Sequence, residues 1–253
     1  MGDMAKYGAL LRDVRCRVVS NEFLSPSVRR LECRAEEAFD ARIGQFALVF
    51  PPRDSLLLGR AFAVAECTKD SFAFWYALKG KGTQALSGLK PGDEVRARGP
   101  LGNAFPKPED GTRVFVVAGG IGAAALALAR STRGEVHLGV PDMSWKPLAE
   151  RFSGSRVFSE DGSLGEKGNA LSGLPEKLTD GDRIWACGPN PMLKALTRKY
   201  KDRLSQLYFS LEARMACGYG GCFGCVVDTV HGKKRVCADG PVFRADEVIW
   251  DAI

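Results

Sequence analysis

Four cysteines near the carboxyl end constrain this chain more than any other feature. Cys217, Cys222 and Cys225 follow one another as C-x4-C-x2-C, and Cys237 comes a short hairpin's length later. This spacing is typical of loops whose four thiolates hold a two-iron, two-sulfur cluster. Such a loop must curl tightly around the metal, and glycine tolerates the positive φ values and the close approach that this requires. The interleaved glycines are Gly218, Gly220, Gly221 and Gly224.

Two other uses of clustered cysteines fit the spacing less well. Structural zinc also takes four thiolates, but its ligands usually come as paired C-x2-C knuckles. A disulfide framework requires an oxidising compartment, and nothing in the sequence indicates one. The sequence therefore predicts a [2Fe-2S] cluster on Cys217, Cys222, Cys225 and Cys237, with zinc as the alternative that stays open.

Length and charge narrow the functional class further. A chain of 253 residues can bury a sizeable core and hold more than one domain. The first residues lead into no apolar signal segment, and no later run has the length and apolar character of a membrane span, so we expect a cytoplasmic protein without a membrane partner. The net charge of +6 is dispersed. Its one basic run, residues 233–235, is interpreted as a solvated hairpin tip rather than a nucleic-acid site.

The first hundred residues have the pattern of antiparallel β structure. Six short runs of strand-forming residues are separated by turn-forming residues, and this close spacing predicts a small closed barrel. The expected strands are 14–19, 28–33, 47–50, 61–65, 71–78 and 94–98. We assign residues 1–105 to this barrel domain.

The barrel sequence carries two features that suit a phosphate. Arg60 stands at the start of a predicted strand, and its planar guanidinium can bind phosphate oxygens. Gly82 and Thr83 precede a predicted helix over 84–89, where free N–H groups and a hydroxyl can bind the same group. Each feature alone is more simply a surface arginine or a helix cap. Together they could hold a pyrophosphate.

The pattern changes after residue 105. Residues 112–118 form a continuous apolar run, typical of a buried parallel strand, and lead into Gly119, Gly120 and Gly122 before a helix that ends near residue 130. A strand, a glycine turn and a helix form a dinucleotide-binding element, although the full G-x-G-x-x-G is absent. Strands at 135–140, 156–159 and 183–186 alternate with helices at 146–152, 169–174 and 191–200. This alternation predicts a parallel, doubly wound sheet over residues 106–205.

Ligands of such sheets bind at the carboxyl ends of the strands. The last predicted strand ends in Cys187, Gly188 and Pro189, so Cys187 is expected near a bound nicotinamide, with a buried structural cysteine as the alternative. Glu160 and Asp161 follow another strand. Their carboxylates could accept hydrogen bonds from ribose hydroxyls and repel a 2′-phosphate, which favours NAD over NADP.

The order of these motifs carries a family resemblance. The chain resembles the ferredoxin–NADP reductase superfamily and, more narrowly, the electron transfer subunits of bacterial NAD-dependent dihydroorotate dehydrogenases. The resemblance covers nearly the whole chain, and its most specific parts are residues 99–105, 187–193, 215–217 and 237–243. It implies an FAD-binding antiparallel barrel, an NAD-binding parallel α/β domain and a small [2Fe-2S] domain over 206–253.

The resemblance also assigns roles to barrel residues. Arg60, Gly82 and Thr83 would hold the FAD pyrophosphate. Two strand segments would line the isoalloxazine or contact the nucleotide, namely Ala61, Phe62 and Ala63, and Trp75, Tyr76 and Ala77. The family usually has proline, an apolar or aromatic residue and then serine or threonine after the arginine. Ala63 lacks that hydroxyl, so a backbone N–H would have to substitute for it near the flavin ring.

The carriers imply an order of electron transfer. NADH delivers two electrons as a hydride and a two-iron cluster takes one, so a flavin must lie between them. In the resembling family the cluster serves an FMN-containing dihydroorotate dehydrogenase catalytic subunit, and we expect two copies of each chain. No residue of the present chain would act as an acid or base on dihydroorotate.

Two alternatives remain open at this point. One is a reductase subunit of another complex, such as a sulfhydrogenase or an NADH-dependent ferredoxin–NADP oxidoreductase. The four cluster cysteines and the tail 239–243 favour the dihydroorotate type, because the small subunit of the latter oxidoreductase tends to replace one cysteine by aspartate. The other is a non-enzymatic, zinc-stabilised binding module on a degenerate reductase fold.

Overall fold

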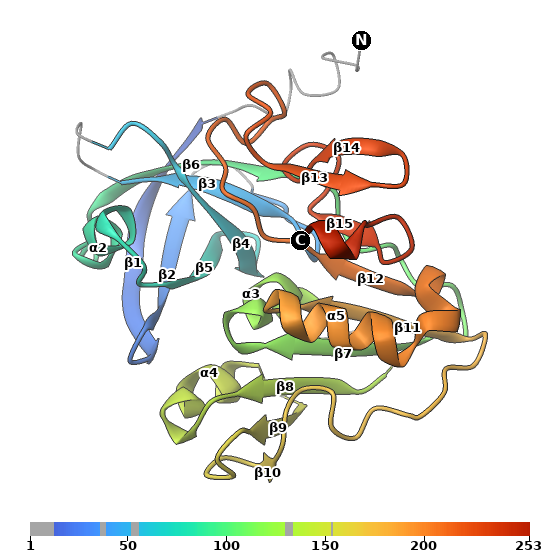
Figure 1. The fold of residues 1–253 in the computed structure, drawn as a ribbon. Coiled ribbons are helices and arrows are strands. Elements are labelled where there is room, and N and C mark those ends of the chain that lie inside the picture. The colour runs from blue at the N-terminus through green and yellow to red at the C-terminus, as the bar shows by residue number, and fades with distance from the viewer. Residues whose placement is uncertain (1–12, 36–38, 52–55, 130–133, 153) are drawn as a thin grey trace.

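Six antiparallel strands of the first hundred residues close into a barrel, as predicted (Figure 1). The computed structural model describes residues 13–35, 39–51, 56–129, 134–152 and 154–253. The barrel strands are β1 (Asp13–Ser25), β2 (Val28–Ala35), β3 (Phe46–Phe50), β4 (Arg60–Cys67), β5 (Ser71–Ala77) and β6 (Glu94–Leu101). They pair in the order β1-β2-β5-β4-β3-β6. Exposed and buried residues alternate at the start of β1, as expected of a strand with one face on a core.

A parallel sheet follows the barrel. Its strands are β7 (Arg113–Gly119), β8 (Val136–Val140), β9 (Ser155–Ser159), β10 (Glu166–Lys167), β11 (Asp182–Cys187), β12 (Leu207–Ser210) and β15 (Val242–Arg244). The order is β10-β9-β8-β7-β11-β12-β15, and only β15 runs antiparallel to its neighbour. The chain starts at β7 in the middle, moves outward to β10 and returns to β11 on the other side of β7. The switch point of this doubly wound sheet therefore lies between β7 and β11.

Short helices connect the strands. Between β5 and β6 lies α2 (Lys81–Ser87), and the glycine turn after β7 becomes η1 (Gly120–Gly122), α3 (Ala123–Leu126) and η2 (Ala127–Ala129). The remaining helices are η3 (Met143–Trp145), α4 (Lys146–Arg151), α5 (Asn190–Lys199), η4 (Lys201–Gln206) and η5 (Trp250–Ala252). None of the helices in the described ranges is long and apolar enough to cross a membrane.

The predicted helix over 169–174 is wrong, because residues 170–173 form a turn. Asn169 Oδ1 accepts a hydrogen bond from the Leu171 N–H at 2.9 Å, and Ser172 Oγ accepts one from the Asn169 N–H at 3.1 Å. These side chains satisfy backbone groups locally and so compete with a helix. Gly173 then adopts a φ of 80°, which an extending helix does not allow.

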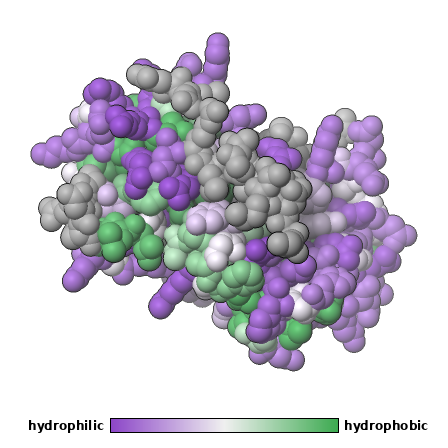
Figure 2. All heavy atoms as spheres, turned by 90° about the horizontal axis from the view of Figure 1, so that it is seen from above, coloured by the Kyte–Doolittle hydropathy of each residue, from purple (hydrophilic) through white to green (hydrophobic). Residues whose placement is uncertain are grey.

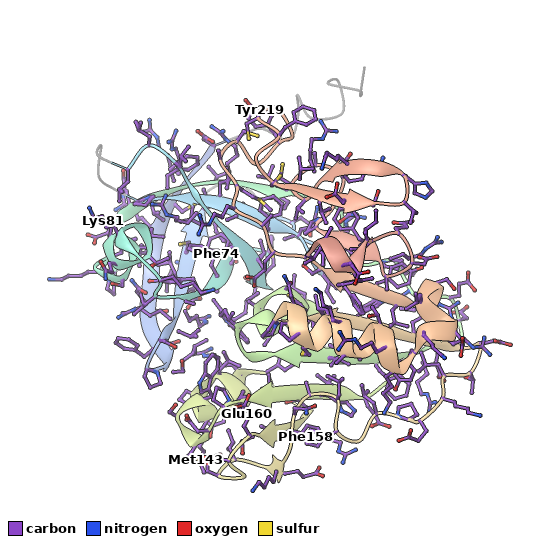
Figure 3. The ribbon with its side chains drawn as sticks, in the orientation of Figure 1. Phe74, Lys81, Met143, Phe158, Glu160 and Tyr219 are labelled. Carbon is purple, nitrogen blue, oxygen red and sulfur yellow. The ribbon has the colours of Figure 1, made fainter. Side chains whose placement is uncertain are left out.

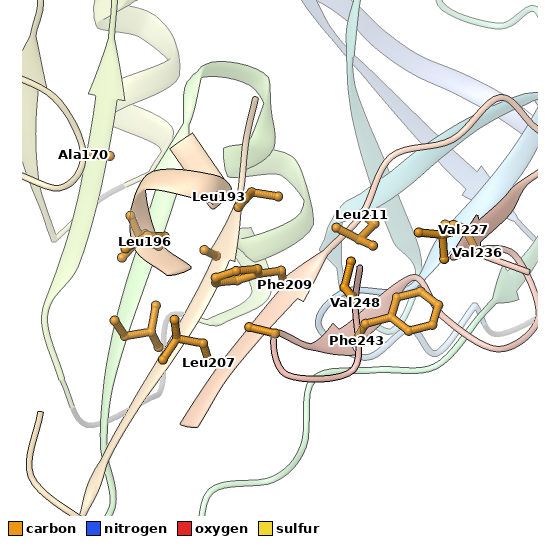
Figure 4. Close-up of a cluster of buried hydrophobic side chains, with 14 of the residues drawn as sticks. Ala170, Leu193, Leu196, Leu207, Phe209, Leu211, Val227, Val236, Phe243 and Val248 are labelled. Atoms are coloured by element: carbon orange, nitrogen blue, oxygen red, sulfur yellow. The ribbon is translucent and has the colours of Figure 1, made fainter. Parts of the chain in front are cut away.

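The carboxyl-terminal segment packs on both larger parts. It contains the hairpin β13 (Val226–Thr229) and β14 (Gly232–Arg235), while β15 joins the sheet beside β12. One apolar cluster runs from Leu193 and Leu196 of α5 through Phe209 to Val227 and Val236 of the hairpin (Figure 4). The sheet and the hairpin therefore share a core. The proposed domain boundaries at 105 and 205 stay predictions.

Asn103 joins the barrel to the carboxyl-terminal segment. Its Nδ2 donates to the Val242 carbonyl at 2.8 Å, its Oδ1 accepts from the Val242 N–H at 2.9 Å, and its own N–H donates to the Gly240 carbonyl at 2.6 Å. Two of the most specific sequence segments, 99–105 and 237–243, therefore meet in space. Both hold the end of the barrel against the start of β15.

Candidate cofactor sites

The four predicted cluster cysteines lie in one loop and its adjoining hairpin, arranged as two pairs. The Cys237 N–H donates to Cys225 Sγ at 3.4 Å, and both residues are buried. Cys217 is half-buried and hydrogen-bonds to exposed Cys222. Within the described ranges, no three His, Cys, Asp or Glu side chains are placed to hold one metal ion. Two thiol pairs fit a two-iron cluster, in which each iron takes two protein ligands.

The backbone of this loop turns as the glycine content predicts. Gly218 has a φ of 77° and Gly220 a φ of 90°. Both approach neighbours closely, since a Cβ on Gly218 would lie 2.7 Å from Leu48 Cδ1 and one on Gly220 would lie 2.8 Å from Ala238 Cβ. Gly221 and Gly224 do not adopt positive φ; Phe223, between them in sequence, has a φ of 56° instead.

Backbone N–H groups point at the sulfurs. The Gly224 N–H donates to Cys222 Sγ at 3.5 Å. Burial works against ionisation of Cys217, but N–H groups of Tyr219 and Cys222 lower the pKa of its thiol to about 7. A thiol that ionises this readily is suited to ligate iron, because the thiolate is the form that binds metal.

Arg235 has a structural role that the sequence analysis missed. Its guanidinium and N–H donate to Asp239, at 3.0 Å from Nε to Oδ2 and 2.7 Å from the backbone N. Its Nη1 donates to the Gly220 carbonyl at 3.1 Å, and its Cζ lies 5.1 Å from the Phe223 ring centroid. The prediction of a solvated tip over 233–235 is therefore wrong for Arg235, which braces the cluster loop. On β14, Lys233 is exposed and Lys234 is partly buried.

A cavity lies where the barrel, the sheet and the carboxyl-terminal segment meet. The barrel and its connection to α2 contribute predicted flavin contacts to its wall, namely Ala61, Phe62, Ala63, Trp75, Tyr76, Ala77 and Thr83. The sheet contributes Gly122 and Cys187 among others. The end of β12 and the segment after it contribute Ser210, Leu211, Glu212, Ala213 and Met215. The cavity therefore reaches from the sheet's switch point to within two residues of Cys217. We call it the flavin cavity, because its wall holds the predicted flavin contacts.

Arg60 meets Gly82 beside this cavity, and Gly82 and Thr83 lie inside the first turn of α2 instead of before the helix as predicted. A Cβ on Gly82 would lie 2.1 Å from Arg60 Nε, so the guanidinium rests directly on the glycine backbone. The structure thus brings together Arg60, Gly82 and Thr83, three residues that the sequence analysis grouped. The Thr83 hydroxyl serves its own turn, accepting from the Gly80 N–H at 3.1 Å and donating to the Gly80 carbonyl at 2.9 Å. The Arg60 guanidinium donates to the Leu58 carbonyl from Nη1.

A second cavity opens at the carboxyl edge of the sheet, at the switch point, and we call it the nucleotide cavity. Its wall includes Gly119, Gly120, Glu160 and Pro189 from the predicted set, together with Trp145, Asn169, Leu171 and Met192. A Cβ on Gly119 would lie 2.7 Å from Met192 Sδ, and one on Gly122 would lie 2.2 Å from the Cys187 carbonyl oxygen. These glycines are therefore required for the close approach of β7 and β11. The same approach lets a dinucleotide contact the backbone.

The predicted residues at this edge divide between the two cavities. Cys187 is buried and lies on the wall of the flavin cavity, and burial, together with nearby Glu212, raises the pKa of its thiol to about 12. Glu160 lies at the other end of the sheet edge, far from Tyr219 of the cluster loop (Figure 3). Asp161 lies outside the cavity wall, where its carboxylate accepts from the Ser163 N–H at 2.9 Å and hydroxyl at 2.7 Å. Gly188 contacts Met192 beside it.

Comparison with known proteins identifies the family. A family described as "Iron-sulfur cluster binding domain of dihydroorotate dehydrogenase B" matches residues 212–249, which contain all four cysteines of the cluster loop. A protein of Aquifex aeolicus called dihydroorotate dehydrogenase B (NAD(+)), electron transfer subunit homolog is 38% identical over 95% of this chain and 100% of its own length. The chain belongs to the dihydroorotate dehydrogenase B electron transfer subunit family. The Caldanaerobacter subterraneus electron transfer subunit is 36% identical over 94% of this chain and 98% of its own.

Solved structures agree with this family assignment. The chain matches a structure of the NADH-dependent reduced ferredoxin–NADP oxidoreductase with a TM-score of 0.75 and 28% identity, covering 93% of this chain and 89% of that one. It matches phthalate dioxygenase reductase with a TM-score of 0.68 and 14% identity, covering 93% and 96%. The second likeness concerns the fold alone. Both support a reductase fold for this electron transfer subunit family member.

Proposed function

We propose that this chain is the electron transfer subunit of an NAD-dependent dihydroorotate dehydrogenase, and that it binds NAD(H), FAD and a [2Fe-2S] cluster. The observation that carries this proposal is the continuous cavity that extends from the sheet's switch point toward the cluster loop. A carrier held there lies between a nicotinamide at Cys187 and iron at Cys217. FAD supplies the exchange between a two-electron hydride and the one-electron cluster.

The chain's own residues position these groups. Arg60, resting on Gly82, is placed to bind the FAD pyrophosphate, because a guanidinium can donate two parallel hydrogen bonds to phosphate oxygens. The apolar walls from β4 and β5 exclude water from the ring. At the sheet edge the Gly119 and Gly120 backbone leaves room for the NAD pyrophosphate, while Glu160 can accept hydrogen bonds from a ribose diol and disfavour a 2′-phosphate.

We further propose that the cluster loop faces the catalytic partner. Residues 221–224 are all exposed, and Phe223 leaves 63% of its surface in solvent although it lies beside cluster ligand Cys222. Figure 2 views the molecule from the side where β13 and β14 lie in Figure 1, and hydrophobic patches interrupt its hydrophilic surface. An exposed aromatic side chain next to a redox centre suits docking of another protein. The partner is an FMN-containing dihydroorotate dehydrogenase, with two copies of each chain.

The cysteines bear on the chain's location in the cell. None of the eight cysteines, all of which lie in the described ranges, forms a disulfide, as expected in a reducing compartment. We therefore propose that the subunit works in the cytoplasm.

A second candidate is a reductase subunit of another complex. The 28% identity and close superposition with the NADH-dependent ferredoxin–NADP oxidoreductase structure favour it. Such a subunit would use the same cavities and cluster but a different partner. The two candidates therefore differ in the identity of the protein that docks at the cluster loop.

The deciding experiment is anaerobic purification of the tagged chain from its own cells, with identification of bound protein, flavin and metal. Recovery of an FMN-containing dihydroorotate dehydrogenase, with one FAD and two irons on this chain, supports the proposal. Recovery of another oxidoreductase keeps the electron route and replaces the partner. Zinc without flavin would overturn the redox function altogether.

A further inference from the structure

A network of ion pairs joins the barrel to helix α4 of the parallel sheet. Arg30 of β2 is only 7% exposed and binds Glu66 of β4 through two bonds, from Nε to Oε1 at 2.9 Å and from Nη2 to Oε2 at 2.7 Å. Its Nη1 donates to Glu32 at 2.8 Å and lies 3.4 Å from Glu22 of β1. Arg151 of α4 completes the network from the other side. Its Nη2 donates to Glu22 at 2.5 Å, and its Nη1 lies 4.0 Å from Glu66.

The charge count shows why Arg151 matters. The barrel places the three carboxylates of Glu22, Glu32 and Glu66 around one guanidinium, that of Arg30. Arg151 is the second cation of this network and comes from the other part of the fold. Carboxylates gathered at a partly buried site repel one another unless cations offset them. Docking of α4 against β1 therefore relieves repulsion within the barrel.

Both ends of this connection reach a cofactor cavity. Glu66 Oε1 also accepts from Trp75 Nε1 at 2.9 Å, and Trp75 lies on the wall of the flavin cavity. Helix α4 begins directly after Trp145, which lies on the wall of the nucleotide cavity, and a Cβ on Gly120 would lie 3.6 Å from the Trp145 ring. Figure 1 shows α4 beside the end of the β1–β2 hairpin. One short helix thus spans from Trp145 to the network beneath Trp75.

We propose that Arg151 is a positioning residue for hydride exchange, because its ion pair with Glu22 locks α4 and Trp145 to the FAD barrel. The hydride donor and acceptor sit on different parts of the fold, so their alignment depends on contacts between those parts. Loss of the pair weakens the attachment of α4 to β1, while the buried apolar residues Leu148, Ala149 and Phe152 keep the helix on its core. Trp145 then loses its fixed place over the glycine turn. This role rests on the proposed function, whereas the locking of α4 does not.

The test compares Arg151→Gln, Glu22→Gln and the double variant with Arg203→Gln in the purified full chain. Arg203 pairs with Asp180 within the sheet part and is 45% exposed against 37% for Arg151, so it matches the chemical change without touching the barrel. Hydrogen exchange over α4 should be about fivefold faster in either single variant. The double variant should exchange no faster than the singles, because both remove the same pair.

A second readout connects locking to function. The KM for NADH, with ferricyanide as acceptor, should rise about threefold to fivefold in Arg151→Gln and Glu22→Gln, and Arg151→Lys should recover part of it. Reduction of the bound flavin by dithionite should stay unchanged in all variants. Unchanged α4 exchange in both single variants, or an equal rise in Arg203→Gln, would overturn the locking role. Faster exchange in a protein that does not oxidise NADH at all would leave the lock standing and reject the proposed function.

Discussion

The cluster loop and the two nucleotide cavities are built in contrasting ways. Three of the four cluster cysteines lie within nine residues, and the fourth returns through one hairpin. The flavin cavity instead takes its wall from the barrel, the α3 turn, the end of β11 and the segment after β12. A site formed by one contiguous loop depends on local backbone geometry. A site formed between parts depends on how those parts are held together, so distant substitutions can affect it.

The largest effect should come from a substitution that removes the cluster and leaves the flavin cavity intact. Cys222→Ser removes an exposed ligand of the outer pair, so the cluster should be lost and electron delivery to the partner should fall below detection. NADH should still reduce the bound flavin at near wild-type rate, since the cavity walls lie elsewhere. Stopped-flow flavin reduction and partner-dependent turnover measure the two steps. Equal loss of both would show that the cluster does not follow the flavin.

Arg60→Ala tests how much one charged side chain contributes to FAD binding in the flavin cavity. The guanidinium that rests on Gly82 is expected to bind the FAD pyrophosphate, and its loss should weaken FAD binding by about 1–3 kcal/mol. Flavin content after dialysis and titration of the apoprotein with FAD measure this change. Iron content should be unaffected, because Arg60 does not contact the cluster loop among the described contacts. FAD affinity equal to that of the wild type would remove Arg60 from the site.

The sequence predicted the cluster loop more completely than the flavin cavity, because the loop is contiguous in sequence and the cavity is formed between parts of the fold. The cysteine spacing identified the cluster loop, and glycine and strand patterns identified the barrel, the parallel sheet and its switch point. The bracing role of Arg235 and the cavity-lining residues Ser210 and Glu212 were missed. Arg235 looked like part of a basic run, and although Asp239 lies only four residues further on, Gly220 becomes a neighbour only through the fold. Leu211 and its neighbours carry no motif, since their role arises from the place where β12 ends.

Arg235→Gln tests whether the contiguous loop also depends on a brace. The arginine joins the Gly220 carbonyl to Asp239 across the loop, and its loss should destabilise the loop by about 1–2 kcal/mol. The expected result is faster release of iron to a chelator, with FAD affinity unchanged. Lys233→Gln is the control, because Lys233 is an exposed residue of the same strand whose Nζ pairs with Asp228 instead of Asp239. Iron release as fast in Lys233→Gln as in Arg235→Gln would assign the effect to net charge instead.

The smallest expected effect is the pH dependence of folding stability that comes from Asp182 in the sheet. This carboxylate is 2% exposed; burial would raise its pKa, but hydrogen bonds from Arg113 and from the N–H and hydroxyl of Thr179 hold the pKa below its ordinary value of 3.8. A lowered folded-state pKa adds stability at pH values above the unfolded-state pKa, and that stability is lost as the pH falls through the folded-state value. The urea midpoint of unfolding, followed by tryptophan fluorescence, should therefore change little because of Asp182 between pH 8 and about pH 5. It should decrease once the pH is below about 4.

Asp182→Asn should lower the midpoint at pH 7 and reduce this acid dependence. An acid dependence as steep in the variant as in the wild type would place its origin in other carboxylates, such as Asp239 of the cluster loop, whose pKa is also lowered by Arg235 despite burial.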